Sequence, residues 1–400
     1  MIIIGKGQVF PSEITTYYDR ISGAKVTKLT SYLAHEYHLY FTNLGWYEDN
    51  QKLLICSDRA NCSNLYSVDL KSGKQTQLTD YSSAERPNIH GTYINPHKKE
   101  AYFTFENQII ALDLESYAER SIFNLQAGYN FSSLSCTADG KYLCFGASQD
   151  LSDQIEINLG SGYVGFEEIE AARPNSKIYE LNLETKEATV IHEENRWIGH
   201  VNTSPTQSHL LTFCHEGPWD VVDHRLWVLD RTTRKAWRIR DNVPNQFAGH
   251  EYWHMDGVTV GYHGFTDAIE HADGKFLGHV RYDGTEQHDY EFPYPNMHVH
   301  SNKEELIVGD GSQPAPHHGQ TYQDCIFLWK KVDGDLKGPR ILCRHRCSSH
   351  SQKVHVHPRI SPDGKQILFT SDMDGYGNVY LVDLLPYEDL PYVEDGKLIK

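Results

Sequence analysis

Histidine recurs along the chain in a pattern that could build a metal site or a catalytic base. It occurs 23 times among 400 residues, and imidazole is both the commonest metal ligand and the usual proton carrier near neutral pH. Two segments show the alternation H-x-H: His298 with His300, and His355 with His357. Because alternate side chains of a strand share one face, each segment can aim two imidazoles in one direction.

Further histidines stand at the start of successive strand-like segments, namely His35, His38, His90, His200, His250 and His254. A lone histidine in a strand is more often a hydrogen-bonded core residue than a ligand, but its return at equivalent positions favours a metal site. The two H-x-H segments and the neighbouring Gln352 can supply three or four ligands. Imidazole suits zinc, iron or nickel, whereas an amide oxygen and open water positions favour a harder octahedral ion, so the metal stays open at this point.

A second group of reactive side chains lies in residues 214–226, which read CHEGPWDVVDHRL. The Gly-Pro pair predicts a turn that projects His215, Glu216, Asp220 and Arg225 from one loop. Arg225 is suited to clamp a carboxylate with two hydrogen bonds; the alternative is a surface salt bridge to Asp223 or Glu216. The chain lacks a nucleophile elbow, a P-loop and a dinucleotide-binding motif. Proton abstraction or metal-assisted chemistry therefore fits better than acyl transfer.

A repeat that runs along the chain predicts the elements that position these residues. Residues 361–384 read SPDGKQILFTSDMDGYGNVYLVDL, and the same order of turn, strand, turn and strand recurs at 47–78, 95–114 and 138–183. Three weaker copies bring the number of units to seven, spaced roughly 40–50 residues apart, which is typical of propellers. We therefore predict an all-β, seven-bladed β-propeller of four-stranded blades, with a β-sandwich or two smaller β domains as the alternative. In a propeller the first strand of each blade lines the central channel, where the histidines would converge.

The chain is expected to form a single domain over residues 1–400. Residues 22–30 (SGAKVTKLT) resemble the outer strand at 72–79 but precede the first unit, while the seventh unit ends at Leu384 without such a strand. The N-terminal strand should therefore complete the last blade and leave no exposed edge. Residues 149–175 interrupt the third unit as an acidic insertion, which we expect to be a loop over one face that could act as a lid.

Composition limits the partners and the compartment. Against 37 basic residues stand 54 acidic ones, a net charge of −17, which argues against non-specific binding to nucleic acid or to an anionic membrane surface. No apolar run is long enough to span a membrane. The first residues do not resemble a secretory signal, and the eight cysteines include no CxxC pair. We expect a cytoplasmic protein with free thiols, while the oligomeric state stays open.

Cys343 and Cys347 lie near His345 and His350, which raises the alternative of a zinc site. No second ligand pair has zinc-site spacing, so reduced thiols in or near strands are the favoured interpretation.

Several of these segments resemble the oligogalacturonate lyases of bacterial pectin breakdown. They are CHEGPWDVVDHRLW, GHEYW, the HxxSN segment that leads to VGDGS, and QKVHVHPRISPDGKQILFTSD, with RWIGH and SGAKVTKLT also similar. The resemblance covers most of the chain; it is strongest between His200 and Asp372 and thin across residues 149–175. Many propellers, TolB-type ones included, share SPDGK…LFTSD, whereas HEGPxDxVDxR and QxxHxHP are much more specific.

The resemblance implies a propeller that holds a manganese ion and splits short galacturonides by β-elimination. It implies four ligands for the ion: His298, Gln352, His355 and His357. It also implies His250 as the general base and Arg225 as the substrate-binding arginine. His300, two residues from His298, is the alternative ligand, and the H-x-x-S-N match favours His298. His200 and His215 are expected to hold substrate carboxylates.

This chemistry suits the residue types. β-Elimination removes the proton at C5, alpha to the uronate carboxylate, while the glycosidic oxygen leaves C4. A metal on the carboxylate stabilises the negative charge that develops, and a neutral imidazole is a suitable base. The acidic exterior favours a small anionic oligosaccharide, such as digalacturonate or unsaturated digalacturonate, over a long polymer.

Two other functions stay open at this point. One is a non-catalytic, TolB-like propeller that binds a protein or a glycan. The other is a metal-dependent hydrolase that uses the same channel, whose products would have gained water.

Overall fold

The computed structural model describes residues 5–160, 162–222, 224–241, 243, 245–266, 275–291, 296–311, 324–394 and 397–399. The chain divides into two compact units, one made of Met1–His90 with Tyr294–Lys400 and the other of Gly91–Pro293. Among the described residues, strands and turns dominate. One α-helix, α1 (Phe166–Ala172), and three 3-10 helices, η1 (Arg59–Asn61), η2 (Gln352–Val354) and η3 (Tyr387–Asp389), accompany them.

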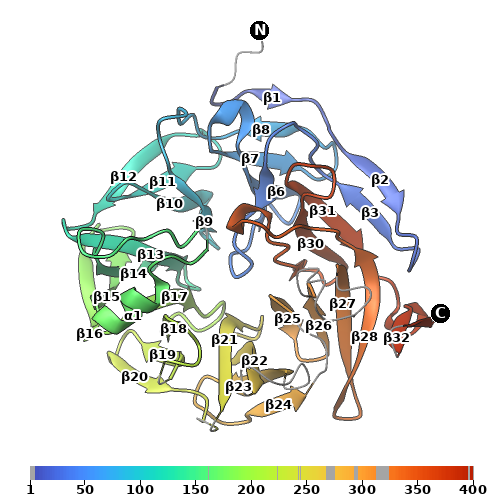
Figure 1. The fold of residues 1–400 in the computed structure, drawn as a ribbon. Helices are drawn as coiled ribbons and strands as arrows, with labels where there is room; N and C mark the ends of the chain where they lie inside the picture. The colour runs from blue at the N-terminus through green and yellow to red at the C-terminus, as the bar shows by residue number, and fades with distance from the viewer. Residues whose placement is uncertain are drawn as a thin grey trace. The chain divides into compact units, whose positions relative to one another are not determined.

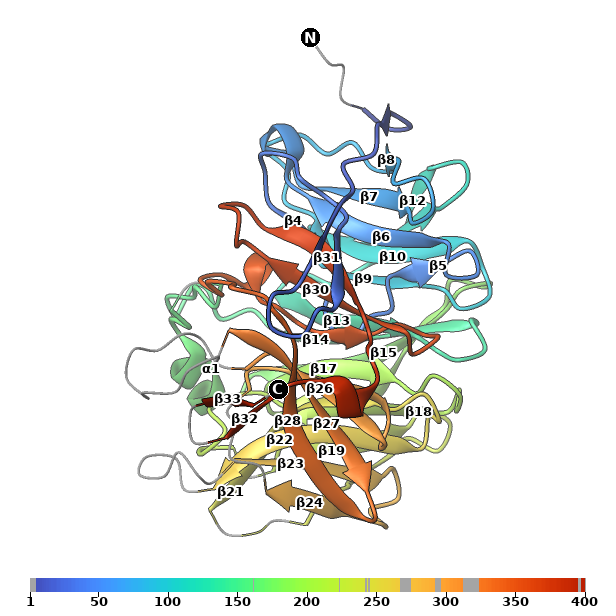
Figure 2. The same ribbon diagram turned by 90° about the vertical axis from the view of Figure 1, so that its right-hand side faces the viewer.

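The first unit contains three antiparallel sheets (Figure 1). The first blade consists of β4 (Glu36–His38), β6 (Lys52–Ser57), β7 (Asn64–Asp69) and β8 (Gln75–Gln77), with β1 (Val9–Phe10) beside β8 and β5 (Trp46–Tyr47) beside β6. The sixth consists of β25 (Val299–Lys303), β26 (Leu306–Gly309), β27 (Cys325–Val332) and β28 (Asp335–Arg344), extended by β32 (Tyr392–Glu394) and β33 (Lys397–Ile399) (Figure 2). The seventh consists of β29 (Arg359–Ile360), β30 (Gln366–Ser371), β31 (Asn378–Asp383), β3 (Lys25–Lys28) and β2 (Thr15–Tyr18).

The second unit contains four sheets of four strands, each strand paired with the next one in the chain. They are β9 (Asn88–Ile94), β10 (Glu100–Phe105), β11 (Gln108–Asp113) and β12 (Glu119–Asn124); β13 (Tyr129–Cys136), β14 (Tyr142–Gln149), β15 (Asn175–Asn182) and β16 (Ala188–Asn195); β17 (Ile198–Thr203), β18 (Leu210–His215), β19 (Leu226–Asp230) and β20 (Lys235–Arg238); and β21 (Gln246–Trp253), β22 (Thr259–Thr266), β23 (Lys275–Arg281) and β24 (His288–Glu291). These seven sheets of the described chain are the blades of a β-propeller, so the predicted fold class is confirmed.

The turn between β29 and β30 shows why a Pro-Asp-Gly sequence favours a hairpin. Oδ1 of Asp363 accepts hydrogen bonds from the Ser361 hydroxyl at 2.7 Å and from the Lys365 amide at 3.1 Å. Gly364 follows with a φ of 70°, a left-handed conformation that a residue with a Cβ adopts only at a cost. The Asp363 carboxylate thus takes the place of a backbone acceptor in the turn.

The N-terminal strand completes the last blade, as predicted. β3 runs antiparallel to β31, with Val26 opposite Val382 and Thr27 opposite Leu381. Just beyond β3, the amide of Leu29 donates to the carbonyl of Val379 at 2.8 Å. The start of the chain and its last repeat therefore share one sheet, so the edge of β31 is covered rather than exposed.

The insertion at residues 149–175 contains a helix that the sequence analysis did not predict. Helix α1 packs on the neighbouring blade, where the rings of Phe166 and Trp197 meet edge to face with centroids 5.4 Å apart. Its buried Glu170 lies 3.6 Å from Arg196. A Cβ added to Gly217 would lie only 2.6 Å from Glu170. The insertion therefore supports the loop that contains residues 214–226.

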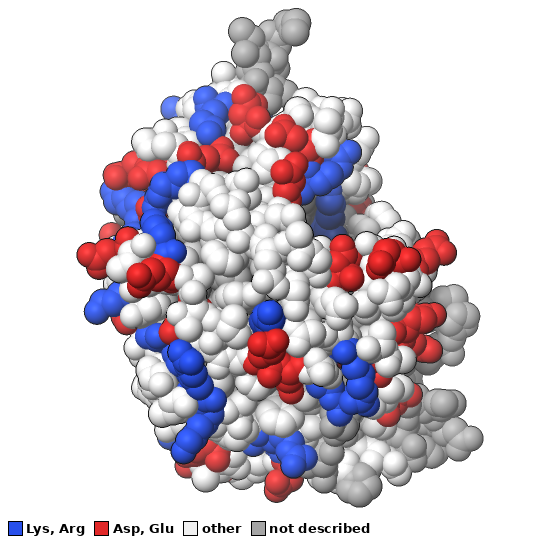
Figure 3. All heavy atoms as spheres, turned by 90° about the vertical axis from the view of Figure 1, so that its left-hand side faces the viewer, with Lys and Arg blue, Asp and Glu red and all other residues white. Residues whose placement is uncertain are grey.

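The surface carries both signs of charge. On the face drawn in Figure 3, basic side chains are interspersed with acidic ones, and neither sign forms a continuous patch there. Among the helices that the structure describes, none has the length and the apolar character that crossing a membrane requires.

The packing between the last and first blades of the first unit predicts a stability effect at Leu29. This side chain is 1% exposed and packs in a cluster with Trp46, Leu368 and Val379. Leu29→Ala should lower the free energy of unfolding by about 3 kcal/mol, because it removes buried methyl groups and leaves a cavity. Denaturant titration measures this. Leu33 is 79% exposed, and Leu33→Ala is the matched control; equal losses in both variants would contradict the packing described here.

Candidate active site

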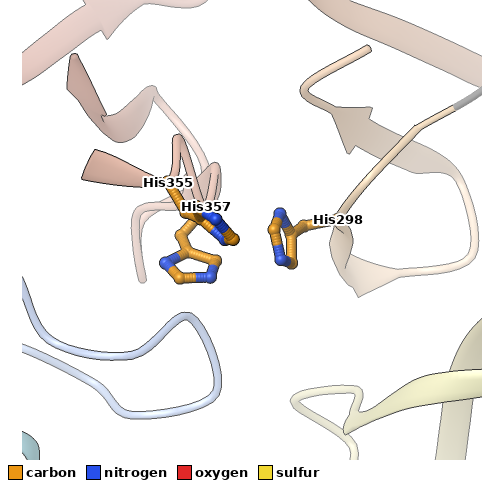
Figure 4. Close-up of side chains that lie close together, drawn as sticks. All are labelled: His298, His355 and His357. Carbon is orange, nitrogen blue, oxygen red and sulfur yellow. The ribbon is translucent and has the colours of Figure 1, made fainter. Parts of the chain in front are cut away.

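Three histidines of the first unit converge from two blades (Figure 4). His298 directly precedes β25, while His355 and His357 lie between η2 and β29. One nitrogen of each ring lies within 4.8 Å of the other two, and all three residues are buried. The ring centroids of His298 and His357 are 4.2 Å apart. This is the geometry of three ligands around one ion.

The environment keeps the rings of His355 and His357 neutral. Burial, followed by the proximity of His298, lowers the pKa of His355 to about 4, and the same two causes hold the pKa of His357 well below its usual range. Within the described residues, Nδ1 of His355 and Nε2 of His357 lack a hydrogen-bond partner. Buried, unpaired nitrogen atoms are costly, and a metal ion would satisfy them because it binds neutral imidazole. The residues present therefore fit a divalent transition metal.

Asp310 orients the first of these histidines. Nδ1 of His298 donates to Oδ2 of Asp310 at 2.7 Å, and the backbone amide of His298 donates to Oδ1 at 2.8 Å. The carboxylate is buried at the end of the β26 hairpin strand. With Nδ1 protonated in this bond, Nε2 carries the lone pair that a metal requires.

The two remaining metal-site candidates differ in their surroundings. η2 places Gln352 one turn before His355, and Gln352 is half-buried. His300 instead lies within β25 and accepts a hydrogen bond at Nδ1 from the amide of Ile360 at 3.4 Å. The group of convergent ring nitrogens includes His298 and not His300.

In the second unit, backbone irregularities set the direction of two other histidines. β17 bulges between Gly199 and Asn202, and β21 bulges between Gly249 and Tyr252. His200 and His250 stand in these bulges with φ values of 49° and 51°, a left-handed conformation that is uncommon for residues other than glycine. Bulges redirect a side chain away from the regular alternation of a strand. The two imidazoles consequently stack in parallel, 11° apart in plane, with centroids separated by 6.4 Å.

Arg225 lies in a buried network of charges. Its Nη1 donates to Oε1 of Glu216 at 2.9 Å, whose other oxygen lies 3.6 Å from Nε2 of His200. Burial alone would raise the pKa of Glu216, but the charges of Arg225 and His200 hold it at about 2. Nε of Arg225 has no hydrogen-bond partner within the described chain, so the guanidinium retains a donor for a ligand carboxylate. Asp223, the alternative partner expected from sequence, lies outside the described residues.

His200 bridges two carboxylates of this network. Its Nδ1 lies 3.3 Å from Oε1 of the fully buried Glu251, on the next blade. Burial lowers the pKa of His200, yet Glu251 and then Glu216 raise it above its usual value overall. These charges favour the imidazolium form, which is suited to bind an anion.

Cys214 also approaches His200 and Glu216, with ligand atoms within 4.8 Å of each other. Burial raises the pKa of the thiol well above its usual range, and Arg225 lies beside Glu216. A protonated thiol and a neighbouring guanidinium suit a cation poorly, so this set is better explained as packing.

His250 forms a pair with a histidine that the sequence analysis did not single out. Its Nδ1 lies 2.8 Å from Nε2 of His263, on β22. The indole of Trp219 meets both rings edge to face, with centroids 5.2 Å from His250 and 5.7 Å from His263.

His215 faces a different environment from Arg225 and His200. Its Nε2 lies 3.0 Å from Oε1 of Glu194, and its ring packs on Trp227 with centroids 4.9 Å apart. Glu216, the next residue, contacts Arg225 and His200 instead, since adjacent side chains of an extended segment point to opposite faces. Asp220 is exposed.

The cysteines act in packing. None of the eight forms a disulfide, and seven are buried. Sγ of Cys347 donates to the carbonyl of Val354 at 2.7 Å, and Nε2 of His345 contacts the carbonyl of Asp310 at 2.8 Å. The described residues near Cys343 contain no group of three potential metal ligands, in line with the favoured interpretation of free thiols.

Comparison with known proteins gives the family. A family model described as oligogalacturonate lyase matches residues 4–387. The chain belongs to the oligogalacturonate lyase family. The predicted family and enzyme class, a lyase that acts on oligogalacturonates, are therefore confirmed, and the non-catalytic alternative loses its support.

Individual relatives agree over nearly the whole chain. It is 27% identical to an oligogalacturonide lyase of Pectobacterium atrosepticum, over 94% of this chain and 98% of the relative. It is also 27% identical to an oligogalacturonate lyase of Dickeya dadantii, with the same coverage. A solved oligogalacturonate lyase in complex with manganese superposes with a TM-score of 0.85 at 26% identity, covering 96% of this chain and 100% of the other.

The contact between Asp310 and His298 predicts a change in metal affinity. Asp310→Asn should weaken manganese binding roughly 10- to 100-fold, because an amide is a weaker acceptor and orients the imidazole less firmly. Isothermal titration with manganese on metal-stripped protein measures it. Asp363→Asn, which alters an exposed turn carboxylate, is the control; identical affinities for both variants would rule out the orienting role of Asp310.

Proposed function

We propose that this lyase cleaves short oligogalacturonides, such as digalacturonate and unsaturated digalacturonate, by β-elimination that depends on manganese. The observation that carries the proposal is the set of three buried imidazoles with ring nitrogens within 4.8 Å of one another. Manganese is chosen because a solved family member is described in complex with it. His298, His355 and His357 would hold the ion, and Gln352 would add an amide oxygen, a ligand suited to a harder octahedral ion.

When bound, the ion would neutralise the uronate carboxylate and so make the C5 proton more acidic. His250 is the proposed base. Its ring is half-buried and lies parallel to the ring of His200, and a neutral imidazole is a suitable proton acceptor.

Arg225 is the proposed clamp for a substrate carboxylate. It is buried, its charge is balanced by Glu216, and its Nε keeps a donor available. His200 would add a second cationic contact from the neighbouring bulge. His215, proposed from sequence as another substrate contact, is better suited to hold the Glu216 segment in place through its bond to Glu194.

A cytoplasmic location and the absence of nucleic-acid or membrane partners belong to the same proposal. The acidic net charge of −17 disfavours nucleic acid and anionic membrane surfaces as partners. Eight cysteines without disulfide bonds suit a reducing compartment.

Variants of each group separate the proposed roles. His250→Gln should lower kcat at least about 100-fold, since a general base contributes that much, while manganese content stays that of the parent. His355→Ala and His298→Gln should lose the metal by elemental analysis. His300→Gln is the matched control and should keep it. Metal retention in both ligand variants, or metal loss in His250→Gln, would overturn the assignments.

A further inference from the structure

We propose that His263 is a positioning residue for the reaction: it fixes the tautomer of His250 that accepts the substrate proton at Nε2. The inference rests on the proposed role of His250 as the base. His263 lies on β22, directly opposite Gly249 in the ladder with β21. The bulge that begins after Gly249 turns His250 toward it, so that Nδ1 and Nε2 of the two rings come within 2.8 Å.

A hydrogen bond between two neutral imidazoles holds one proton, and its position decides the chemistry. If His263 donates from Nε2, the proton of neutral His250 must be on Nε2, and that nitrogen cannot act as a base. If His250 donates from Nδ1, its lone pair is on Nε2. A proton from the substrate has to go to Nε2, since Nδ1 already lies in the histidine pair. The active pair therefore has His263 as the acceptor, with its own proton on Nδ1.

The surrounding side chains fix this pair rather than leaving it to rotate. Trp219 packs edge to face against both imidazoles and stacks on Phe265 at an interplanar angle of 7°. An added Cβ on Gly249 would lie 2.6 Å from the indole, so the strand has no room to move away. His263 is 8% exposed. A catalytic base held this tightly keeps the geometry that proton transfer requires.

The proton balance is simple. The C5–H bond breaks and its proton goes to Nε2 of His250, while its electron pair forms the C4–C5 double bond and the C4–O pair leaves with the second sugar. The Nδ1–H of the new imidazolium remains bonded to Nε2 of His263, now as a charge-assisted hydrogen bond. His250 then returns its proton to solvent and the leaving oxygen takes one from solvent, so no water is added overall.

The test compares His263→Phe, which keeps a planar ring without nitrogen, with His263→Gln, whose amide oxygen can still accept from Nδ1. In the manganese-loaded enzyme, His263→Phe should lower kcat about 100-fold with little change in KM. The primary isotope effect on kcat with C5-deuterated digalacturonate should rise, because proton transfer becomes slower than the other steps. His263→Gln should recover most of the lost kcat. His279→Gln, a buried histidine on β23 of the same blade, is the control and should behave like the parent.

Three outcomes would overturn the inference: a parental kcat in His263→Phe, equal losses in the Phe and Gln variants, or a lower kcat with an unchanged isotope effect. The last two would indicate a structural role only. Thermal melting checks folding; if His263→Phe is unfolded, His263→Asn, too short to reach Nδ1, replaces it under the same criteria. His250→Gln separates the proposed base from the proposed positioning residue. A parental kcat in His250→Gln would refute His250 as the base. A low kcat in His250→Gln together with a parental kcat in His263→Phe would refute only the positioning role of His263.

Discussion

Three of the histidines at the candidate site depend on places where the backbone leaves the regular β conformation. His200, His250 and His357 all have φ values between 45° and 51°, and a residue with a Cβ in that region costs of order 1–3 kcal/mol. Such strain persists only when the surrounding structure holds the backbone in place. In the two bulges, the strained conformation changes the direction of the side chain. A regular strand would alternate its side chains, whereas the bulges of β17 and β21 bring His200 and His250 into one parallel stack.

The candidate site also requires that its buried charges be balanced. Arg225 and His200 share a low-dielectric environment with Glu216 and Glu251, and each carboxylate makes the neighbouring cation less costly to bury. His355 and His357, near the proposed metal, follow the opposite rule, because burial and the proximity of His298 favour their neutral forms. One fold thus provides cationic groups for carboxylates and neutral nitrogen atoms for an ion. The net charge of −17 does not oppose this, since local groups dominate the potential inside a site.

Sequence patterns predicted the repeat architecture because each blade is a local hairpin unit with its own turn residues, such as Asp363 and Gly364. They also predicted that residues 22–30 pair with the last blade, because the seventh repeat lacks an outer strand of its own. The H-x-H pattern alone did not separate His298 from His300; in the structure His298, whose ring is held by Asp310 twelve residues away, belongs to the group of convergent ring nitrogens, and His300 does not. No sequence motif singled out His263, which lies in one of the weaker repeats. Its proposed role depends on a bulge in the adjacent strand, which the sequence pattern does not show. Helix α1 was missed because its seven residues are too few to show a helical period.

The central claim is that this site eliminates rather than hydrolyses. The most direct measurement is mass spectrometry of the products of digalacturonate, with metal-stripped enzyme and again after manganese is restored. We expect products only when manganese is present. The masses of these products should add up to that of the substrate, because the C4–O bond breaks without water. Products heavier by one water would contradict it, and would assign hydrolysis to the same residues.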